Sequence, residues 1–119
     1  MKSGRGDVVL VSFPFASAAG AKLRPALVVQ SDHNNRRLAN TILVQITTNT
    51  SRADKEATQV LVDPATPAGQ SSGLLSRSAI TCENIATVDS SKVLRKIGDL
   101  SAALMQQVND ALKASLALT

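Results

Sequence analysis

Short runs of apolar and β-branched residues, separated by polar or small residues, fill most of the chain up to residue 97. Runs of this kind predict β-strands when turn-forming residues bound them. We expect strands at residues 7–13, 24–30, 41–47, 58–62, 78–82, 84–88 and 93–97. The connections at 14–23, 48–57 and 64–73 are predicted loops, and the polar stretch 31–40 is predicted to be a turn or a short helix.

The C-terminal residues follow a different period. Apolar residues recur there at helical spacing, at Leu104, Val108, Ala111, Leu112 and Leu116. Ser101 precedes them and is a suitable N-cap. Many short strands followed by one helix predict a mainly β protein with α (α+β), built as a small barrel with a packed helix. At this length we expect a single domain over residues 1–119.

Composition narrows the class of protein further. No apolar run approaches the roughly 18 residues that a membrane span needs. The N-terminus lacks the small-residue cleavage site of a secretory signal, so we expect a cytoplasmic protein. Because Cys82 is the one cysteine and His33 the one histidine, an internal disulfide and a zinc site of the usual His/Cys type are excluded. The carboxylates are scattered along the chain, and we interpret the protein as free of metal and cofactor.

The charge balance allows a polyanionic partner without requiring one. Lys and Arg number 13 against 9 Asp and Glu, a formal net charge of +4. Cationic residues near phosphates release counterions and so favour nucleic-acid binding, but many basic proteins bind no nucleic acid. The only aromatic residues are Phe13 and Phe15, which argues against an RNA-binding platform that stacks bases on several exposed rings.

A few residues could carry chemistry, although each also has an ordinary structural explanation. Pro25 forces Arg24 into an extended conformation and confines this end of the strand to a sheet edge or a strand start. An arginine held in this way offers a forked pair of donors to a phosphate, or is simply a surface residue. Thr47 can donate a hydrogen bond at a strand end. Glu83 is either a base or one exposed position of an alternating strand, and Cys82 is more typical of a small core residue.

Taken together in order and spacing, several segments resemble the MazF/PemK family of toxin endoribonucleases. The matching segments are Gly6-Asp7-Val8, Arg24 to Val29, Ile46-Thr47-Thr48, Leu75 to Ile80, Ile85 to Asp89, and Lys96 to Ser101 leading into the helix. The resemblance implies an SH3-like β-barrel with a C-terminal α-helix, paired as a homodimer. It also implies a toxin of a type II toxin-antitoxin system that binds a cognate antitoxin protein.

The same resemblance implies the activity and its residues. Such a toxin is expected to cleave single-stranded RNA at short sequences without a metal, by attack of the 2′-hydroxyl that leaves a 2′,3′-cyclic phosphate and a 5′-hydroxyl. The active-site arginine and threonine of the family fall on Arg24 and Thr47, and Glu83 is the candidate base. Arg24 is expected to stabilise charge on the phosphate, since a guanidinium does not readily give up its proton. The expected substrate-binding residues are Lys22, Thr48, Ser78 and Asn84.

Two alternatives stay open, and one of them follows from a departure from the family. Many members carry an arginine where this chain has Ala86, between Ile85 and Thr87. A relative that has lost its activity and acts by binding is therefore one alternative. A CcdB-like DNA gyrase poison is the other, although that family ends its helix in a tryptophan-containing tip and this chain has no tryptophan.

Overall fold

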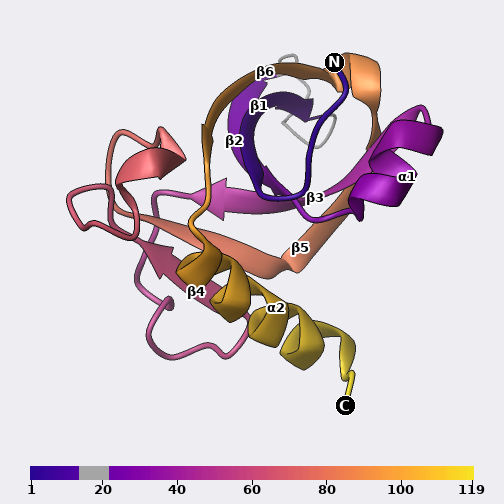
Figure 1. Ribbon diagram of the computed structural model, residues 1–119. Coiled ribbons are helices and arrows are strands. Elements are labelled where there is room, and N and C mark those ends of the chain that lie inside the picture. Colours follow the sequence, from indigo (N-terminus) through magenta and orange to yellow (C-terminus); the bar gives the residue numbers. More distant parts are fainter. Residues whose placement is uncertain (14–21) are drawn as a thin grey trace.

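The computed structural model describes residues 1–13 and 22–119, and shows a curled antiparallel sheet with a helix packed on one side (Figure 1). The strands are β1 (Asp7–Phe13), β2 (Lys22–Val28), β3 (Asn40–Thr47), β4 (Gln59–Val62), β5 (Ser78–Asp89) and β6 (Val93–Asp99). The helices are α1 (Asp32–Arg37) and α2 (Ala102–Leu116), with short 3₁₀ turns η1 (Gln70–Ser72) and η2 (Ser90–Lys92). The strand order in the sheet is β4-β5-β3-β2-β1-β6. The predicted mainly β fold with a C-terminal helix is confirmed.

Two strand predictions need correction. The runs at 78–82 and 84–88 form one long strand, β5, because the Cys82 amide donates to the Thr58 carbonyl (2.9 Å) and pairing with β3 resumes at Ile85. The second strand begins at Lys22, so Arg24 lies within β2 and not at its start. Of the loop predicted at 14–23, residues 14–21 lie outside the described residues.

Pro25 lies in an interior strand of the sheet, but its surroundings suit a proline. It is paired with Leu10 of β1, whereas pairing of β2 with β3 begins only at Ala26. This end of β2 therefore has a strand partner on one side only. A residue without a backbone N–H is tolerated where one ladder is absent.

Alternation along the strands divides the apolar side chains into two cores. One lies between the sheet and α2, and the other lies inside the curl formed by β1, β2, β3, β6 and the end of β5 (Figure 1). Neighbours in sequence separate accordingly, with Val8 in the first core and Val9 in the second. Because the side-chain period of a strand is two, one sheet can serve both cores. The first core buries Val8, Leu27, Val44, Ile46, Val60, Val62, Ile80, Cys82, Leu100, Leu104, Val108 and Ala111, and the second buries Val9, Val11, Ala26, Val28, Leu43, Val88 and Val93.

The curl is not a closed barrel, since the end strands β4 and β6 are not paired with each other in the described part of the chain. The turn η1 instead lies against β6. A Cβ added to Gly98 would lie 2.3 Å from the carbonyl carbon of Ser72, and one added to Gly73 would lie 1.9 Å from the Ile97 carbonyl oxygen. These two backbones approach so closely that neither position has room for a side chain.

The helix α2 begins where the sequence predicts. Ser101 is its N-cap, and the hydroxyl accepts a hydrogen bond from the Leu104 amide (3.3 Å). Its buried residues, Leu104, Val108 and Ala111, are three of the five positions that set the helical spacing. No helix in residues 1–13 and 22–119 is long and apolar enough to cross a membrane.

Candidate functional site

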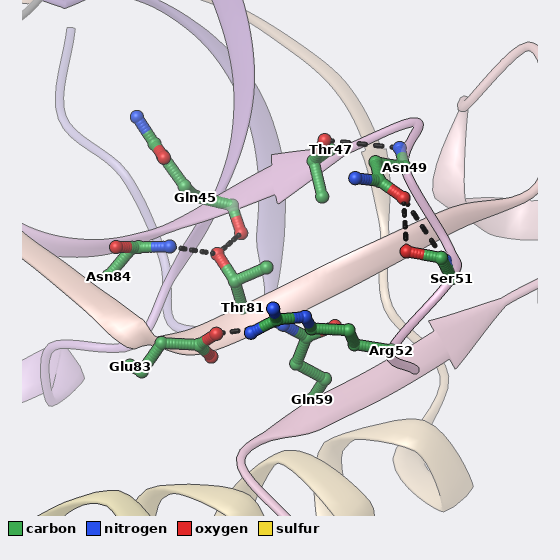
Figure 2. Close-up of a pocket in the computed structure, with 9 residues that line it drawn as sticks. All are labelled: Gln45, Thr47, Asn49, Ser51, Arg52, Gln59, Thr81, Glu83 and Asn84. Carbon is green, nitrogen blue, oxygen red and sulfur yellow. Dashed lines mark hydrogen bonds between the residues drawn. The ribbon is translucent and has the colours of Figure 1, made fainter. Parts of the chain in front are cut away.

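A hollow lined by polar side chains lies where β3, β4 and β5 meet (Figure 2). Its volume of about 230 Å³ is below the roughly 300–1,000 Å³ of pockets that enclose a whole ligand. It therefore suits one part of a larger molecule. We call it the polar pocket; it is lined by Gln45, Thr47, Asn49, Ser51, Arg52, Gln59, Thr81, Glu83 and Asn84.

The polar pocket owes its shape to an irregularity in β5. Gln45 is paired with Thr81, but the preceding residue, Val44, is paired with Ile85. Residues 82–84 therefore have no partner on β3. The Cys82 side chain turns into the core, and Glu83 and Asn84 are exposed beside the pocket. Bulges of this kind commonly redirect side chains near functional sites.

Thr81 is hydrogen-bonded to two other residues that line the polar pocket, Gln45 and Asn84. Its side chain is 4% exposed, and its hydroxyl donates to the Gln45 carbonyl (2.9 Å). The same hydroxyl accepts from the Asn84 side-chain amide (3.1 Å). This hydrogen bond to Thr81 orients the Asn84 side-chain amide, and its carbonyl oxygen is directed away from Thr81 (Figure 2).

Thr47 presents a hydroxyl at the end of β3. Its oxygen accepts a hydrogen bond from the Asn49 amide (3.1 Å), and Asn49 in turn accepts from the amide and hydroxyl of Ser51 (3.1 and 2.8 Å). These contacts order the turn after β3. Since the Thr47 hydroxyl acts only as an acceptor in them, it keeps its own proton to donate to a ligand.

Glu83 is exposed but not free to move. One carboxylate oxygen accepts from the Thr58 hydroxyl (3.1 Å) and the other from the Gln59 side-chain amide (2.7 Å). Arg52 reaches the same region from the loop between β3 and β4 (Figure 2). The polar pocket therefore contains a carboxylate, a guanidinium and several neutral donors and acceptors.

Arg24 does not line the polar pocket, but it lies at the same end of the sheet. It is exposed on β2 and paired with Val11 of β1. Ladder pairing between β2 and β3 stops at Ala26 and Gln45. Two further residues in that register would bring Arg24 opposite Thr47, on the same face of the sheet. In the described part of the chain, no carboxylate lies within 4.0 Å of the Arg24 guanidinium.

The structure brings together three of the predicted site residues, Thr47, Glu83 and Asn84, in the polar pocket. Thr48 is exposed just beyond β3 and does not line it. Ser78 is buried, with its hydroxyl donating to the Ser76 carbonyl (2.9 Å), so it faces away from the pocket. Lys22 is the first residue of β2, and its side chain lies outside the described part of the structure.

Six residues that line the polar pocket were not predicted from the sequence: Gln45, Asn49, Ser51, Arg52, Gln59 and Thr81. Gln45 and Thr81 become neighbours only through the antiparallel pairing of β3 with β5. Gln59 reaches the site because β4 pairs with the other edge of β5. No local pattern signals these pairings, since they join residues distant in sequence. Arg52 looks like an ordinary charged residue of a surface loop.

The remaining candidates for chemistry lie elsewhere. His33 is exposed on α1. Burial, with a smaller contribution from the neighbouring Glu83 carboxylate, raises the pKa of the Cys82 thiol from 9.0 to about 11, and a thiol in that state is a poor nucleophile. Among the described residues, no three His, Cys, Asp or Glu side chains gather closely enough to hold a metal ion.

Comparison with known proteins defines the class to which this fold and site belong. Residues 4–116 match the family described as PemK-like, MazF-like toxin of type II toxin-antitoxin system. The chain is 34% identical over 115 residues to Endoribonuclease EndoA of Bacillus subtilis, covering 96% of this chain and 94% of that protein. It is also 34% identical over 106 residues to Endoribonuclease MazF6 of Mycobacterium tuberculosis, covering 88% of each. The chain belongs to the PemK/MazF toxin family.

Solved structures share the fold. A mycobacterial endoribonuclease in complex with its cognate antitoxin superposes with a TM-score of 0.78 at 23% identity, over 98% of this chain and 97% of that one. A MazF from Deinococcus radiodurans, in a MazE-MazF structure, superposes with a TM-score of 0.74 at 18% identity over the full length of both chains. The resemblance to the family seen in the sequence is confirmed.

Proposed function

We propose that this protein is a metal-independent endoribonuclease that cleaves single-stranded RNA, acting as the toxin of a type II toxin-antitoxin pair. The supporting observation is that Thr47 and Glu83 line one polar pocket, while Arg24 lies at the same end of the sheet with no carboxylate within 4.0 Å in the described residues. A guanidinium that no carboxylate neutralises, at the same end of the sheet as a carboxylate and a hydroxyl donor, is suited to phosphodiester chemistry. Curated relatives named endoribonucleases support the same activity.

The reaction would use the 2′-hydroxyl of the RNA as the nucleophile. Glu83 takes its proton, the 2′ oxygen bonds to the adjacent phosphorus, and the bond from phosphorus to the 5′ oxygen breaks. The 5′ oxygen leaves and takes up a proton from solvent. The products are a 2′,3′-cyclic phosphate and a 5′-hydroxyl, with atoms and charge balanced and no metal in the scheme.

Arg24 and Thr47 would act on the phosphate. Negative charge grows on the non-bridging oxygens as the phosphorus gains its fifth oxygen, and a guanidinium can bind two of those oxygens at once. The Thr47 proton is available to donate to the same phosphate, because among the described residues the hydroxyl accepts the Asn49 amide and donates to no other group. We propose Asn84, Thr48 and Lys22 as substrate-binding residues, and Asn84 lines the polar pocket. The buried Ser78 is not carried into this proposal.

A cleavage assay tests this function. Purified protein is incubated with a long unstructured RNA in excess chelator, and the ends of the fragments are mapped. We expect discrete cuts with 5′-hydroxyl ends, reduced by about a hundredfold or more in Arg24→Ala, as for the loss of other charge-stabilising donors. Arg24→Lys, which keeps the charge but not the fork, should be intermediate. Absence of cutting by the folded wild-type protein would overturn the proposal, and a gyrase supercoiling assay would then test the CcdB-like alternative.

We further propose that the protein works as a homodimer and that a cognate antitoxin blocks it. A disordered acidic tail that folds over Arg24 and the polar pocket would bind tightly while remaining exchangeable. Adding the cognate antitoxin to the cleavage assay should stop cutting, and Arg24→Ala should bind RNA and antitoxin more weakly than wild type. Simultaneous binding of antitoxin and RNA with undiminished cleavage would contradict this competition.

A further inference from the structure

The side chains that hold Glu83 in place belong to two consecutive residues, Gln59, which is the first residue of β4, and Thr58 before it. Thr58 and Gln59 are adjacent in sequence, yet their donors go to different oxygens of the Glu83 carboxylate, at 3.1 and 2.7 Å. The Thr58 carbonyl also accepts the Cys82 amide at 2.9 Å. Three hydrogen bonds therefore join residues 58–59 to residues 82–83, at the place where β5 loses its partner on β3.

An exposed glutamate usually samples several rotamers, because ordering a long side chain has an entropic cost that a single surface contact seldom offsets. Two donors on separate oxygens define both the position and the plane of the carboxylate. Hydrogen bonds to a charged acceptor are about twice as strong as neutral ones. The pair of contacts therefore holds the carboxylate in one orientation.

Holding the Glu83 carboxylate in this orientation has an energetic cost, which falls on Gln59. Its side-chain carbonyl oxygen is buried and has no hydrogen-bond partner among the described residues. Turning the amide over would direct that oxygen at the Glu83 carboxylate, where two acceptors would repel each other. The amide is therefore held by its bond to Glu83, while its own acceptor goes unsatisfied.

The two contacts leave the carboxylate able to accept more. An ionised carboxylate has about four lone-pair sites, and Thr58 and Gln59 occupy two of them. The remaining sites are free for a hydroxyl proton of the substrate. Fixing a base within hydrogen-bond reach of that proton is worth part of the roughly 10²–10⁴-fold that general base catalysis supplies.

We infer that Thr58 and Gln59 are positioning residues that hold the Glu83 carboxylate in the orientation needed to take the 2′-hydroxyl proton. This inference rests on the proposed function, in which Glu83 is the base. It assigns no chemistry to Thr58 or Gln59 themselves. They act through Glu83. Their loss should lower kcat and leave substrate binding nearly unchanged.

The test uses steady-state cleavage of a short RNA containing the mapped cut site. Thr58→Val, which removes the hydroxyl at constant shape, and Gln59→Ala should each lower kcat by about tenfold, with KM within about twofold of wild type. Thr58→Ser restores the donor and should recover most of the lost rate. Gln107→Ala, on the exposed face of α2, is the surface control, and urea midpoints for all variants monitor folding.

A double-mutant comparison shows whether the effect passes through Glu83. In a Glu83→Gln background the base is absent, so adding Thr58→Val or Gln59→Ala should lower kcat no further. An equal tenfold loss in both backgrounds would overturn the inference, as would a change confined to KM. A third outcome would also overturn it, namely wild-type kcat in Thr58→Val and Gln59→Ala.

These outcomes separate the inference from the function on which it rests. If Glu83→Gln lowers kcat by a hundredfold or more while both positioning variants cut normally, the base is correctly assigned and only the positioning role fails. If Glu83→Gln cuts at the wild-type rate, Glu83 is not the base, and the inference fails together with that assignment.

Discussion

Two consecutive residues of β5 show how sharply the environment changes from one position to the next. Cys82 is fully buried in the core beneath α2, whereas Glu83 is exposed at the polar pocket. The thiol is consequently kept neutral by burial and by the adjacent carboxylate, which together raise its pKa to about 11. Conversely, the carboxylate stays in contact with solvent.

The Cys82 shift predicts an alkaline loss of stability. In the unfolded chain the thiol loses its proton near pH 9.0, but in the folded protein it keeps the proton until about pH 11. The unfolded state therefore binds fewer protons in this window, and the free energy of unfolding falls as pH rises through it. At roughly 1.4 kcal/mol per pKa unit, the loss amounts to about 2 to 3 kcal/mol.

Urea unfolding of wild type and Cys82→Ala between pH 8 and about pH 11 measures this effect. The variant is less stable at every pH because it leaves a small cavity, so the slopes with pH are compared and not the absolute values. Part of the wild-type slope comes from lysines such as Lys96, whose pKa is raised by its bonds to Asp99 and Asp7. That part is common to both proteins. Equal slopes would show that Cys82 ionises in the folded state as in the unfolded one.

Among the elements, α2 has the simplest relation to its sequence. Leu104, Val108 and Ala111 face the first core, Leu116 at the last turn is exposed, and the Ser101 side chain caps the first turn. Ser101→Ala should lower the free energy of unfolding by about 1 kcal/mol, because the Leu104 amide loses its acceptor. Ser101→Asp keeps an acceptor and should stay within a few tenths of a kcal/mol of wild type. Equal stability of all three in urea unfolding would mean that the cap contributes nothing.

The strand β5 behaves differently, since its character comes from its neighbours. It is paired with β3 on one edge and β4 on the other, and the three residues 82–84 have no ladder partner on either strand. Read along the chain, this stretch looks like two strands interrupted by Glu83. The hydrogen bond from the Cys82 amide to the Thr58 carbonyl keeps β5 continuous through this stretch.

At the scale of the whole molecule, the backbone of residues 70–73 packs directly against the backbone of the end strand β6. The turn η1 and Gly73 lie against β6 at Ile97 and Gly98, where no Cβ fits. Gly98→Ala should therefore lower the free energy of unfolding by about 2 kcal/mol or more, since the obstructing atoms are backbone and cannot rotate away. Gly4→Ala is the matched control, because its nearest neighbour would lie 3.6 Å away, an ordinary contact.

Thermal or urea unfolding of both glycine variants makes the comparison. A Gly98→Ala protein as stable as Gly4→Ala would mean that residues 70–73 move off β6 without consequence for the rest of the fold. None of the residues in this contact lines the polar pocket, so the surviving folded fraction of Gly98→Ala should keep the wild-type KM for RNA.

The sequence by itself determined the elements, the class and the family of this protein. Hydrophobic periodicity is a local property, and so the helix α2, its cap at Ser101 and most strands could be predicted with small errors at their ends, whereas β5 was divided into two strands. The spacing of segments such as Arg24 to Val29 and Ile46 to Thr48 indicated the family, which the match over residues 4–116 confirms. Thr47 lies in one of those segments, and the resemblance to the family also led to the prediction of Glu83 and Asn84 as site residues.

Only the tertiary structure decided which residues surround Thr47, Glu83 and Asn84. Whether Glu83 would be free or held depended on the pairing of β4 with β5, which brings Thr58 and Gln59 to its two oxygens. Ordinary alternation along β5 buries Ser78, Ile80 and Cys82, whereas the break in the ladder with β3 leaves the consecutive residues Glu83 and Asn84 both exposed. Register between strands distant in sequence is set by the packing of two cores at once, and a one-residue slip reverses every side chain, so no local pattern carries that information.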